Sequence, residues 1–285
     1  MSKLGWHWQR RRNRFRERLD SGEPAFIVGV DIPWTPLAEI VGSAKADAAF
    51  IDMEHTTLSL TDVENLIVAC DAAGISALVR PAGLDVAAAS RALDSGAHGV
   101  IFPDIRTRAQ VERAVAATKY PPEGSRPWGG AHTRIVMWEG VLASKALQED
   151  DPERRGVYSH EFVRHANDGV HTTILIESPE GVANLPEMVQ VPGIDAFWFG
   201  WADYSAHVGF DLERCTQAAN TVYDTCRAAG IGMCLALDQA ETQPWYPGCF
   251  YLAGLDTLVL AGALRGAVAG ARQRVDQARE CARKP

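Results

Sequence analysis

The amino-acid sequence predicts an α/β fold, a closed (β/α)8 TIM barrel, on three observations. The chain has 285 residues, of which 47% are hydrophobic and 22% charged, and a chain of this size can form one large core. Short apolar runs rich in Val, Ile and Phe alternate with helical patterns, which is typical of repeated βα units and a parallel sheet. Eight such runs fit into about 260 residues, so a closed barrel is favoured over an open sheet.

The expected strands and helices follow one another along most of the chain. The strands are expected at 26–32, 48–54, 76–82, 99–105, 172–178, 194–200, 232–238 and 256–262. Helices are expected between them at 35–44, 61–74, 85–96 and 107–120, and a last helix at 264–284. The second of these helices is predicted to carry a capping box from Thr61 to Glu64 and to end near Gly74.

Residues 1–22 are expected to form a basic helical arm ahead of a single barrel domain at 23–285. Six arginines lie between Arg10 and Arg18, which leaves an RNA-binding arm as one alternative. The apolar residues Phe15 and Leu19 favour a helix that lies against its own barrel or against a neighbouring subunit.

The connection after the fourth strand is much longer than the others and spans residues 106–171 approximately. We interpret it as an elaborated loop over the C-terminal end of the barrel, where such barrels place their active sites. An insertion without regular structure is the alternative.

Charge and cysteine content narrow the function classes. The formal net charge is −8 and the isoelectric point is about 5.5, which argues against binding to nucleic acid or to an anionic membrane. The six cysteines contain no C-x-x-C pair, so a structural zinc site is not expected. No run approaches 18 consecutive apolar residues. We therefore expect a cytoplasmic protein that acts on a small molecule.

Polar residues at the C-terminal ends of the expected strands are the candidate site, because only strand ends face a barrel's active site. Together they can hold a hard divalent cation through oxygen ligands, place an imidazole beside it and bind an anion in a guanidinium fork. They are Asp52, Glu54 and His55 after strand two, Arg80 after strand three, Glu177 after strand five and Asp203 after strand six.

Several motifs around these residues resemble the class II pyruvate aldolases of the HpcH/HpaI family, in the same order. They read IDMEH, VRP, LDSGAHGVIFP, KYPPEGSR, LIESPEGVANL and GWADYSAHVG. The resemblance implies a metal-dependent barrel that cleaves or forms 4-hydroxy-2-oxo acids through the enolate of pyruvate or a related 2-oxo acid. It also implies Mg²⁺, Mn²⁺ or Co²⁺ as the cofactor, a small 2-oxo acid and an aldehyde as substrates, and a homohexamer.

The resemblance also implies roles for individual residues. Glu177 and Asp203 would hold the metal, Arg80 would contact the 2-oxo acid, and His55 with Asp52 would be the proton-transfer pair. In this pair we expect Asp52 to fix the tautomer of the imidazole. The backbone amides of Trp201 and Ala202 would receive the substrate carboxylate.

Three departures from the family pattern concern the substrate. Leu175 stands where many members have a substrate-facing Gln, so one polar contact is missing, and GWADY replaces the usual GPADL. Pro127 replaces a usual glycine. In the long connection, four residues either line a pocket for the aldehyde or lie at a subunit interface: Trp128, His132, Arg134 and Trp138.

Other activities remain open at this point. A CoA-ester lyase or a 2-oxo-dicarboxylate decarboxylase of the same superfamily would also pass through a metal-bound enolate. A barrel that binds a 2-oxo acid without catalysis is the alternative of a different class. Schiff-base chemistry is disfavoured, because none of the five lysines falls in an expected strand.

Overall fold

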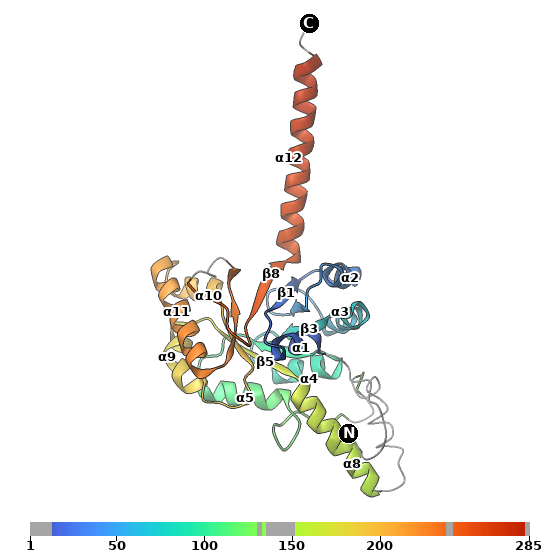
Figure 1. Cartoon of the computed structure of the whole chain (residues 1–285), viewed down its shortest axis with the longest axis vertical. Helices are drawn as coiled ribbons and strands as arrows, with labels where there is room; N and C mark the ends of the chain where they lie inside the picture. The colour runs from blue at the N-terminus through green and yellow to red at the C-terminus, as the bar shows by residue number, and fades with distance from the viewer. Residues whose placement is uncertain (1–12, 130–132, 135–151, 238–241, 283–285) are drawn as a thin grey trace.

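Eight parallel strands form a closed barrel and follow one another around it in chain order (Figure 1). This computed structural model describes residues 13–129, 133–134, 152–237 and 242–282. The strands are β1 (Ala25–Val30), β2 (Ala48–Asp52), β3 (Ser76–Arg80), β4 (Gly99–Phe102), β5 (His171–Ile176), β6 (Ala196–Phe199), β7 (Gly232–Leu235) and β8 (Phe250–Leu255). β8 pairs with β1 and closes the barrel. The predicted (β/α)8 barrel is confirmed.

Helices cover the outside of the barrel and bury the outward apolar side chains of the strands. Ile51 and Val79, for example, belong to the same buried cluster as Leu66 and Ile67 of the helix between their strands. The covering helices are α2 (Pro36–Ser43), α3 (Leu60–Ala73), α4 (Val86–Asp94), α5 (Arg108–Thr118), α9 (Pro179–Met188) and α11 (Leu212–Ala229), and the short α10 (Trp201–His207) follows β6.

The capping box of helix α3 lies two residues earlier than predicted. The box joins Ser59 and Asp62: the Asp62 backbone N–H donates to Ser59 Oγ, and the Ser59 backbone N–H donates to Asp62 Oδ2. The prediction of Thr61 and Glu64 is wrong, because Leu60 already lies inside the helix. The predicted end at Gly74 is confirmed, where a left-handed backbone (φ 72°) suits a residue without a Cβ.

The N-terminal end of the barrel is closed by helix α1 (Arg14–Asp20), which inserts Phe15 among the inward side chains of the strands. The Phe15 ring lies edge-on to His171, with centroids 4.9 Å apart, and to Phe250, at 5.1 Å. Asn13 donates from Nδ2 to the carbonyl of Gly169 at 2.8 Å. The described part of the basic arm therefore lies against its own barrel.

The buried His171 predicts acid-dependent stability. Burial lowers the pKa of His171 to about 4 from an ordinary value of 6.5, because a charged ring is disfavoured in this apolar interior. Between these two values the unfolded chain binds a proton that the folded chain does not. This residue should therefore reduce the free energy of unfolding by about 3 kcal/mol as the pH falls from 6.5 to 4.

Urea denaturation of wild type and His171→Gln at a series of pH values measures this effect as a difference. The comparison removes contributions from other groups, since they are shared by both proteins. The stability difference between the two proteins should shrink or change sign in the acid range. An identical pH dependence in both would contradict the assignment.

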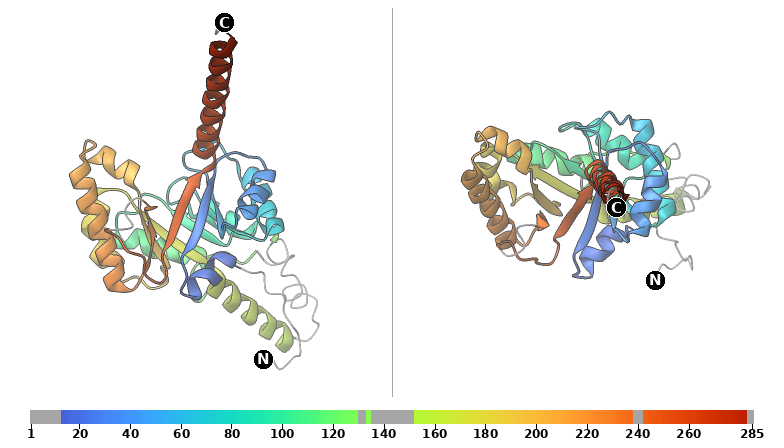
Figure 2. Two further views of the ribbon diagram at one scale, coloured as in Figure 1. Left: turned by 45° about the horizontal axis from the view of Figure 1, so that its top comes forward. Right: turned by 90° about the horizontal axis from the view of Figure 1, so that it is seen from above.

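The chain ends in helix α12 (Asp256–Ala282), which projects away from the barrel (Figures 1 and 2). The prediction of a strand at 256–262 is wrong, since the last strand is β8 and helix begins at Asp256. An apolar run of this length suits a strand or a helix equally. Here the Ala-rich sequence that follows continues it as a helix. No helix in the described ranges is both long and apolar enough to cross a membrane.

The described part of the extra length between β4 and β5 lies at the N-terminal end of the barrel. Helix α5 begins six residues after β4, as in an ordinary βα unit, and helix α8 (Pro152–Gly169) leads into β5 at the end opposite α12 (Figure 1). For the described part of the insertion, our interpretation as a loop over the active site is therefore wrong, and residues 130–132 and 135–151 lie outside the described residues. Trp128 packs edge-on to Phe162 of α8, with centroids 5.0 Å apart, and Arg134 pairs with Asp71 at 2.9 Å. Neither lines a substrate pocket at the C-terminal end, whereas His132 and Trp138 lie outside the described residues.

Candidate active site

The candidate residues gather at the C-terminal rim of the barrel, as parallel strands require. Asp52 and Arg80 end the neighbouring strands β2 and β3 and are register partners. Glu177 directly follows β5, and Asp203 lies in the first turn of α10, directly after β6. His55 follows Asp52 by three residues in the loop after β2. Four separate strands thus contribute polar groups to one rim.

Asp52 and Arg80 form a buried bidentate pair. Arg80 Nε donates to Asp52 Oδ1 at 2.7 Å and Nη2 donates to Oδ2 at 2.6 Å, while the guanidinium lies 5.2 Å from the centroid of Phe50. Burial alone would raise the pKa of Asp52, but the hydrogen bonds and charge of Arg80 outweigh it and hold this pKa below its ordinary value. Asp52 thus remains ionised and fixes the orientation of the guanidinium.

This pairing changes how Arg80 can bind an anion. A guanidinium has five N–H donors, and Asp52 occupies two of them. The remaining N–H donors on Nη1 and Nη2, at the far end of the guanidinium, can still form two parallel hydrogen bonds to an anion. Glu54 Oε2 lies 3.4 Å from Nη1 and is buried without a hydrogen-bond partner among the described residues.

His55 lies among different carboxylates from the one we expected. Its Nε2 is 3.8 Å from Glu54 Oε2 and 3.8 Å from Asp203 Oδ2. Asp52 contacts this residue only through the His55 backbone N–H, which donates to Oδ2 at 3.4 Å. The expectation that Asp52 fixes the imidazole tautomer is therefore not met, because its oxygens already serve Arg80. The His55 side chain is 57% exposed, so a molecule at the rim can reach its ring.

Glu177 is held in place by two backbone features. The Asp104 N–H donates to Glu177 Oε1 at 2.6 Å, and Asp104 has a left-handed backbone (φ 49°). A Cβ at position 200 would collide with the Glu177 carboxylate, so Gly200 allows β6 to approach it. Burial raises the pKa of Glu177 to about 7, and the nearby charges of Glu54 and Asp203 raise it further. The hydrogen bond from Asp104 lowers this pKa but does not outweigh burial.

Glu54, Glu177 and Asp203 place three negative charges near one another at the rim, where they repel one another. Over the described parts of the chain, no group of three or more His, Cys, Asp or Glu side chains is arranged so that it could hold a metal ion. Two carboxylates, those of Glu177 and Asp203, remain as candidate ligands, and a hard divalent cation would stabilise their ionised forms. A cation held by Glu177 and Asp203 would thus take its remaining ligands from water or substrate oxygens, which Mg²⁺ and similar ions readily accept.

Leu175 lies inside the barrel below this carboxylate cluster. It precedes Glu177 by two residues, pairs in register with Trp198 of β6 and is 2% exposed. Strand alternation places Leu175 and Glu177 on the same face. Leu175, at the position predicted to have lost a polar contact, therefore presents a buried apolar surface beneath the candidate site.

Sequence reasoning missed one part of the site, the Asp104 N–H. Its Asp–Ile–Arg context could have indicated a special turn, since Asp104 also binds Arg106 through both carboxylate oxygens at 2.7 and 2.9 Å. Glu54 was named as a candidate without a role, because its position between Arg80 and His55 depends on the loop after β2 and leaves no signal in residue spacing.

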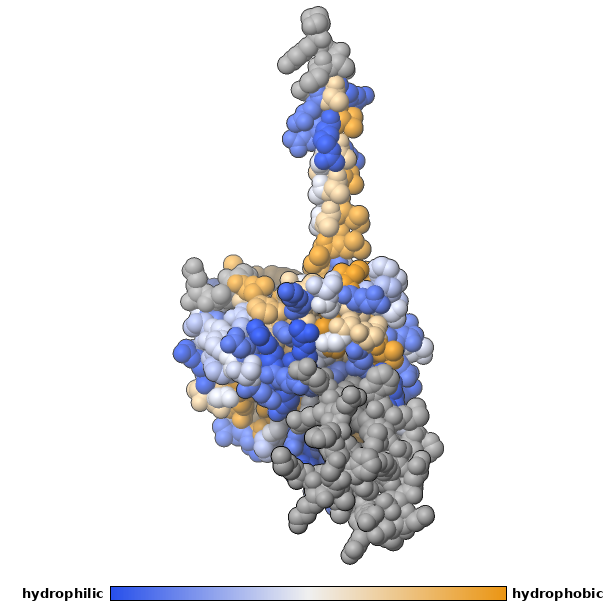
Figure 3. Space-filling model, turned by 45° about the vertical axis from the view of Figure 1, so that its right-hand side comes forward, coloured by the Kyte–Doolittle hydropathy of each residue, from blue (hydrophilic) through white to orange (hydrophobic). Residues whose placement is uncertain are grey.

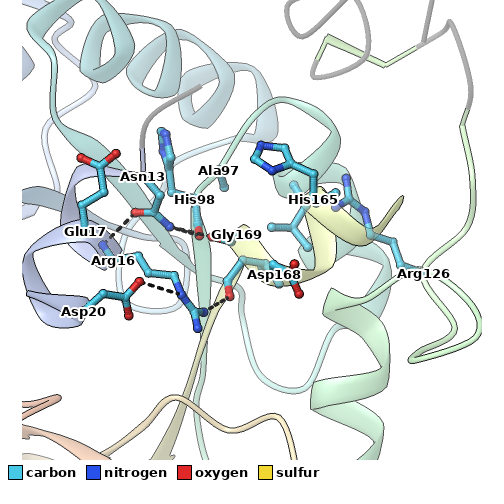
Figure 4. Close-up of a pocket in the computed structure, with 13 residues that line it drawn as sticks. Asn13, Arg16, Glu17, Asp20, Ala97, His98, Arg126, His165, Asp168 and Gly169 are labelled. Carbon is cyan, nitrogen blue, oxygen red and sulfur yellow. Dashed lines mark hydrogen bonds and ion pairs between the residues drawn. The ribbon is translucent and has the colours of Figure 1, made fainter. Parts of the chain in front are cut away.

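A hollow of about 110 Å³ lies at the end of the barrel opposite the candidate residues, between α1, α4 and α8 (Figure 4). Its two arginines are engaged within the chain: Arg16 Nη1 donates to the Val170 carbonyl at 2.9 Å and to Asp195 at 3.0 Å. Arg126 Nη2 donates to Asp94 at 2.7 Å. These contacts tie α1 and the segment before β5 to the barrel, so we interpret this end as structural.

Comparison with known proteins identifies the family of this barrel. A model of the HpcH/HpaI aldolase/citrate lyase family matches residues 34–244, which is more than half of the chain. The chain belongs to this family. A hydroxypyruvate/pyruvate aldolase from Pseudomonas aeruginosa is 28% identical over 263 residues, covering 89% of this chain and 90% of the relative. A 4-hydroxy-2-oxo-heptane-1,7-dioate aldolase from Salmonella arizonae is 31% identical over 266 residues, covering 90% and 93%.

Solved structures agree with the family assignment. An HpcH/HpaI aldolase/citrate lyase family protein from Burkholderia cenocepacia J2315 superposes with a TM-score of 0.77 and 25% identity. The superposition covers 92% of this chain and 100% of the other. The curated HpcH/HpaI relatives described above are aldolases, which are carbon–carbon lyases.

Proposed function

We propose that this protein is a divalent-metal-dependent aldolase that cleaves or forms 4-hydroxy-2-oxo acids through the enolate of pyruvate or a close homologue. The observation that carries the proposal is the arrangement of Arg80, Glu177, Asp203 and His55 at one rim, with a buried Glu177 among like charges. Family membership supports the same chemistry.

The proposed roles follow from what each side chain can reach. Mg²⁺, Mn²⁺ or Co²⁺ held by Glu177 and Asp203 would act as a Lewis acid and stabilise negative charge on the keto oxygen. The end-on donors of Arg80 bind the anionic 2-oxo acid. The first-turn amides of Trp201 and Ala202, which lack partners within their helix, receive its carboxylate.

His55 performs the proton transfers in this proposal. In the cleavage direction its imidazole removes the proton from the C4 hydroxyl, the C3–C4 bond breaks, and the aldehyde leaves. The bond's electron pair forms the enolate of pyruvate, and return of the proton to C3 gives pyruvate. Glu54 and Asp203, each 3.8 Å from Nε2, stabilise the protonated ring while it holds the proton.

Pyruvate release from a 4-hydroxy-2-oxo acid, coupled to lactate dehydrogenase, tests the proposed activity. We expect release that stops with EDTA and returns with added Mn²⁺. Tight pyruvate binding without release would instead indicate a non-catalytic barrel. Decarboxylation of oxaloacetate without any aldol cleavage would replace the aldolase proposal by a decarboxylase.

We also propose a homo-oligomer, a hexamer as the resemblance implies, in which α12 is covered by other subunits. Six apolar side chains of α12 are at least half exposed in the single chain, and they spread along the helix (Figure 3). So many exposed apolar side chains on one projecting helix are typical of an interface. The six are Leu258, Val259, Leu260, Leu264, Val268 and Val275.

Light scattering coupled to size exclusion measures the assembly. We expect a mass several times the 31.0 kDa of one chain, and a lower mass for Leu264→Glu combined with Val268→Glu. A monomer across the micromolar range would contradict the proposal.

A further inference from the structure

An apolar cavity lies beside the C-terminal ends of β6 and β7, the middle of β8 and the start of α10. Its volume is about 300 Å³. Ten of its eleven lining residues are apolar and none is charged, including Trp198, Trp201, Leu235, Leu237 and Leu252. The remaining lining residue, Gln243, is 2% exposed and donates from Nε2 to Asn220 Oδ1 at 3.0 Å.

Two shared tryptophans connect this cavity to the charged site. Trp198 lies edge-on to Phe50, with ring centroids 5.3 Å apart, and Phe50 lies beneath the Arg80 guanidinium. Trp201 opens α10 two residues before Asp203. The cavity wall is thus linked to Arg80 through Phe50 and to Asp203 through the first turn of α10.

The floor next to the cavity is apolar as well. Leu175 and Trp198 are register partners on β5 and β6, so their side chains lie on the same face of the barrel wall. A hydroxyl or carboxylate placed against these surfaces would lose its water without gaining a partner, which is costly. An alkyl or aromatic group would gain from the same burial.

We propose that this cavity binds the non-reacting part of the aldehyde, and that the physiological aldehyde carries an aliphatic or aromatic substituent. This inference rests on the proposed aldolase function. It excludes aldehydes with a second carboxylate or several hydroxyls as the preferred partners. In the condensation direction, C3 of pyruvate bonds to the aldehyde carbon, whose oxygen takes up a proton, while the substituent enters the cavity.

A homologous series of aldehydes tests the inference on the full-length, metal-loaded protein with pyruvate as donor. From propanal to heptanal, kcat/KM should rise about fourfold per added methylene until the cavity is filled, the equivalent of about 0.8 kcal/mol per CH₂. Pentanal should exceed succinic semialdehyde, which has a similar length and a terminal carboxylate, by at least about tenfold.

The variant Leu237→Lys places a charge at the cavity edge, where Leu237 is 53% exposed and a lysine can be accommodated. We expect it to lower kcat/KM for hexanal about tenfold and to flatten the chain-length series. The kcat/KM value for each aldehyde is divided by the rate at which the same variant exchanges pyruvate methyl protons. This ratio removes any effect of unfolding or of damage to the pyruvate site. Val68→Lys, at a 43% exposed position on α3, is the matched control and should keep the wild-type series.

The outcomes separate the inference from the function on which it rests. A wild-type protein that exchanges pyruvate protons but prefers succinic semialdehyde or glyceraldehyde, or shows no chain-length dependence, overturns the apolar subsite alone. A metal-loaded wild type that exchanges no protons overturns the aldolase proposal, and the subsite with it.

Discussion

Replacing Glu177 or Asp203 by Ala should abolish metal retention and aldol cleavage together. Glu177 is buried and fixed by the Asp104 N–H, whereas the Asp203 side chain is 52% exposed. In the proposed site these two carboxylates are the protein ligands, and loss of either leaves one. Since a Lewis-acid metal supplies several kcal/mol of transition-state stabilisation, activity should fall by about 10³-fold or more.

Metal content by elemental analysis after gel filtration, measured beside activity, checks this result. Glu180→Ala is the control, because Glu180 is exposed and lies only three residues beyond Glu177. It should retain both metal and activity. The exposed Asp203 keeps the test valid if Glu177→Ala fails to fold. Full metal occupancy in both Glu177→Ala and Asp203→Ala would refute the ligand assignment.

His55→Ala should reduce kcat by about 10² to 10⁴-fold, which is the usual contribution of a general acid or base to catalysis. The affinity for pyruvate should remain nearly unchanged. The His55 ring is exposed at the rim and makes no bidentate contact that the fold depends on. Its loss should therefore affect proton transfer more than folding or binding. Steady-state kinetics of cleavage give kcat and KM separately.

Arg80→Lys is the informative comparison for His55→Ala. It keeps the charge but loses both the paired hydrogen bonds to Asp52 and the planar group over Phe50. KM for the 2-oxo acid should rise and kcat should fall, because Arg80 contacts the substrate before and during the reaction. A His55→Ala protein with an unchanged kcat would remove His55 from the proton-transfer role.

Most of the barrel could be predicted from the sequence because each buried strand is a short apolar run of its own. The first seven predicted strands all coincide with observed ones. The eighth could not be placed, since residues 250–255 and 256–262 are both apolar and only tertiary packing decides between strand and helix. The described part of the long connection was assigned to the wrong end of the barrel, because the length of the connection is visible in the sequence and the position of α5 within it is not.

Residue types at the strand ends predicted which groups form the candidate site, but not which groups pair. Asp52 and Glu54 both precede His55 closely, and spacing alone cannot tell which carboxylate faces the imidazole. The register of β2 against β3 decides it, because it places Asp52 beside Arg80 and leaves Glu54 near His55. The apolar cavity likewise depends on three strands that lie far apart in the sequence.

Exchange of pyruvate methyl protons with deuterated solvent, followed by NMR, tests the central claim most directly, because it reports enolate formation without any aldehyde. We predict rapid exchange by the wild-type protein with Mg²⁺, Mn²⁺ or Co²⁺, loss of exchange with EDTA, and no exchange by Asp203→Ala. Exchange that persists unchanged in EDTA and in Asp203→Ala, or its absence from the metal-loaded wild type, would contradict a metal-dependent enolate at this rim.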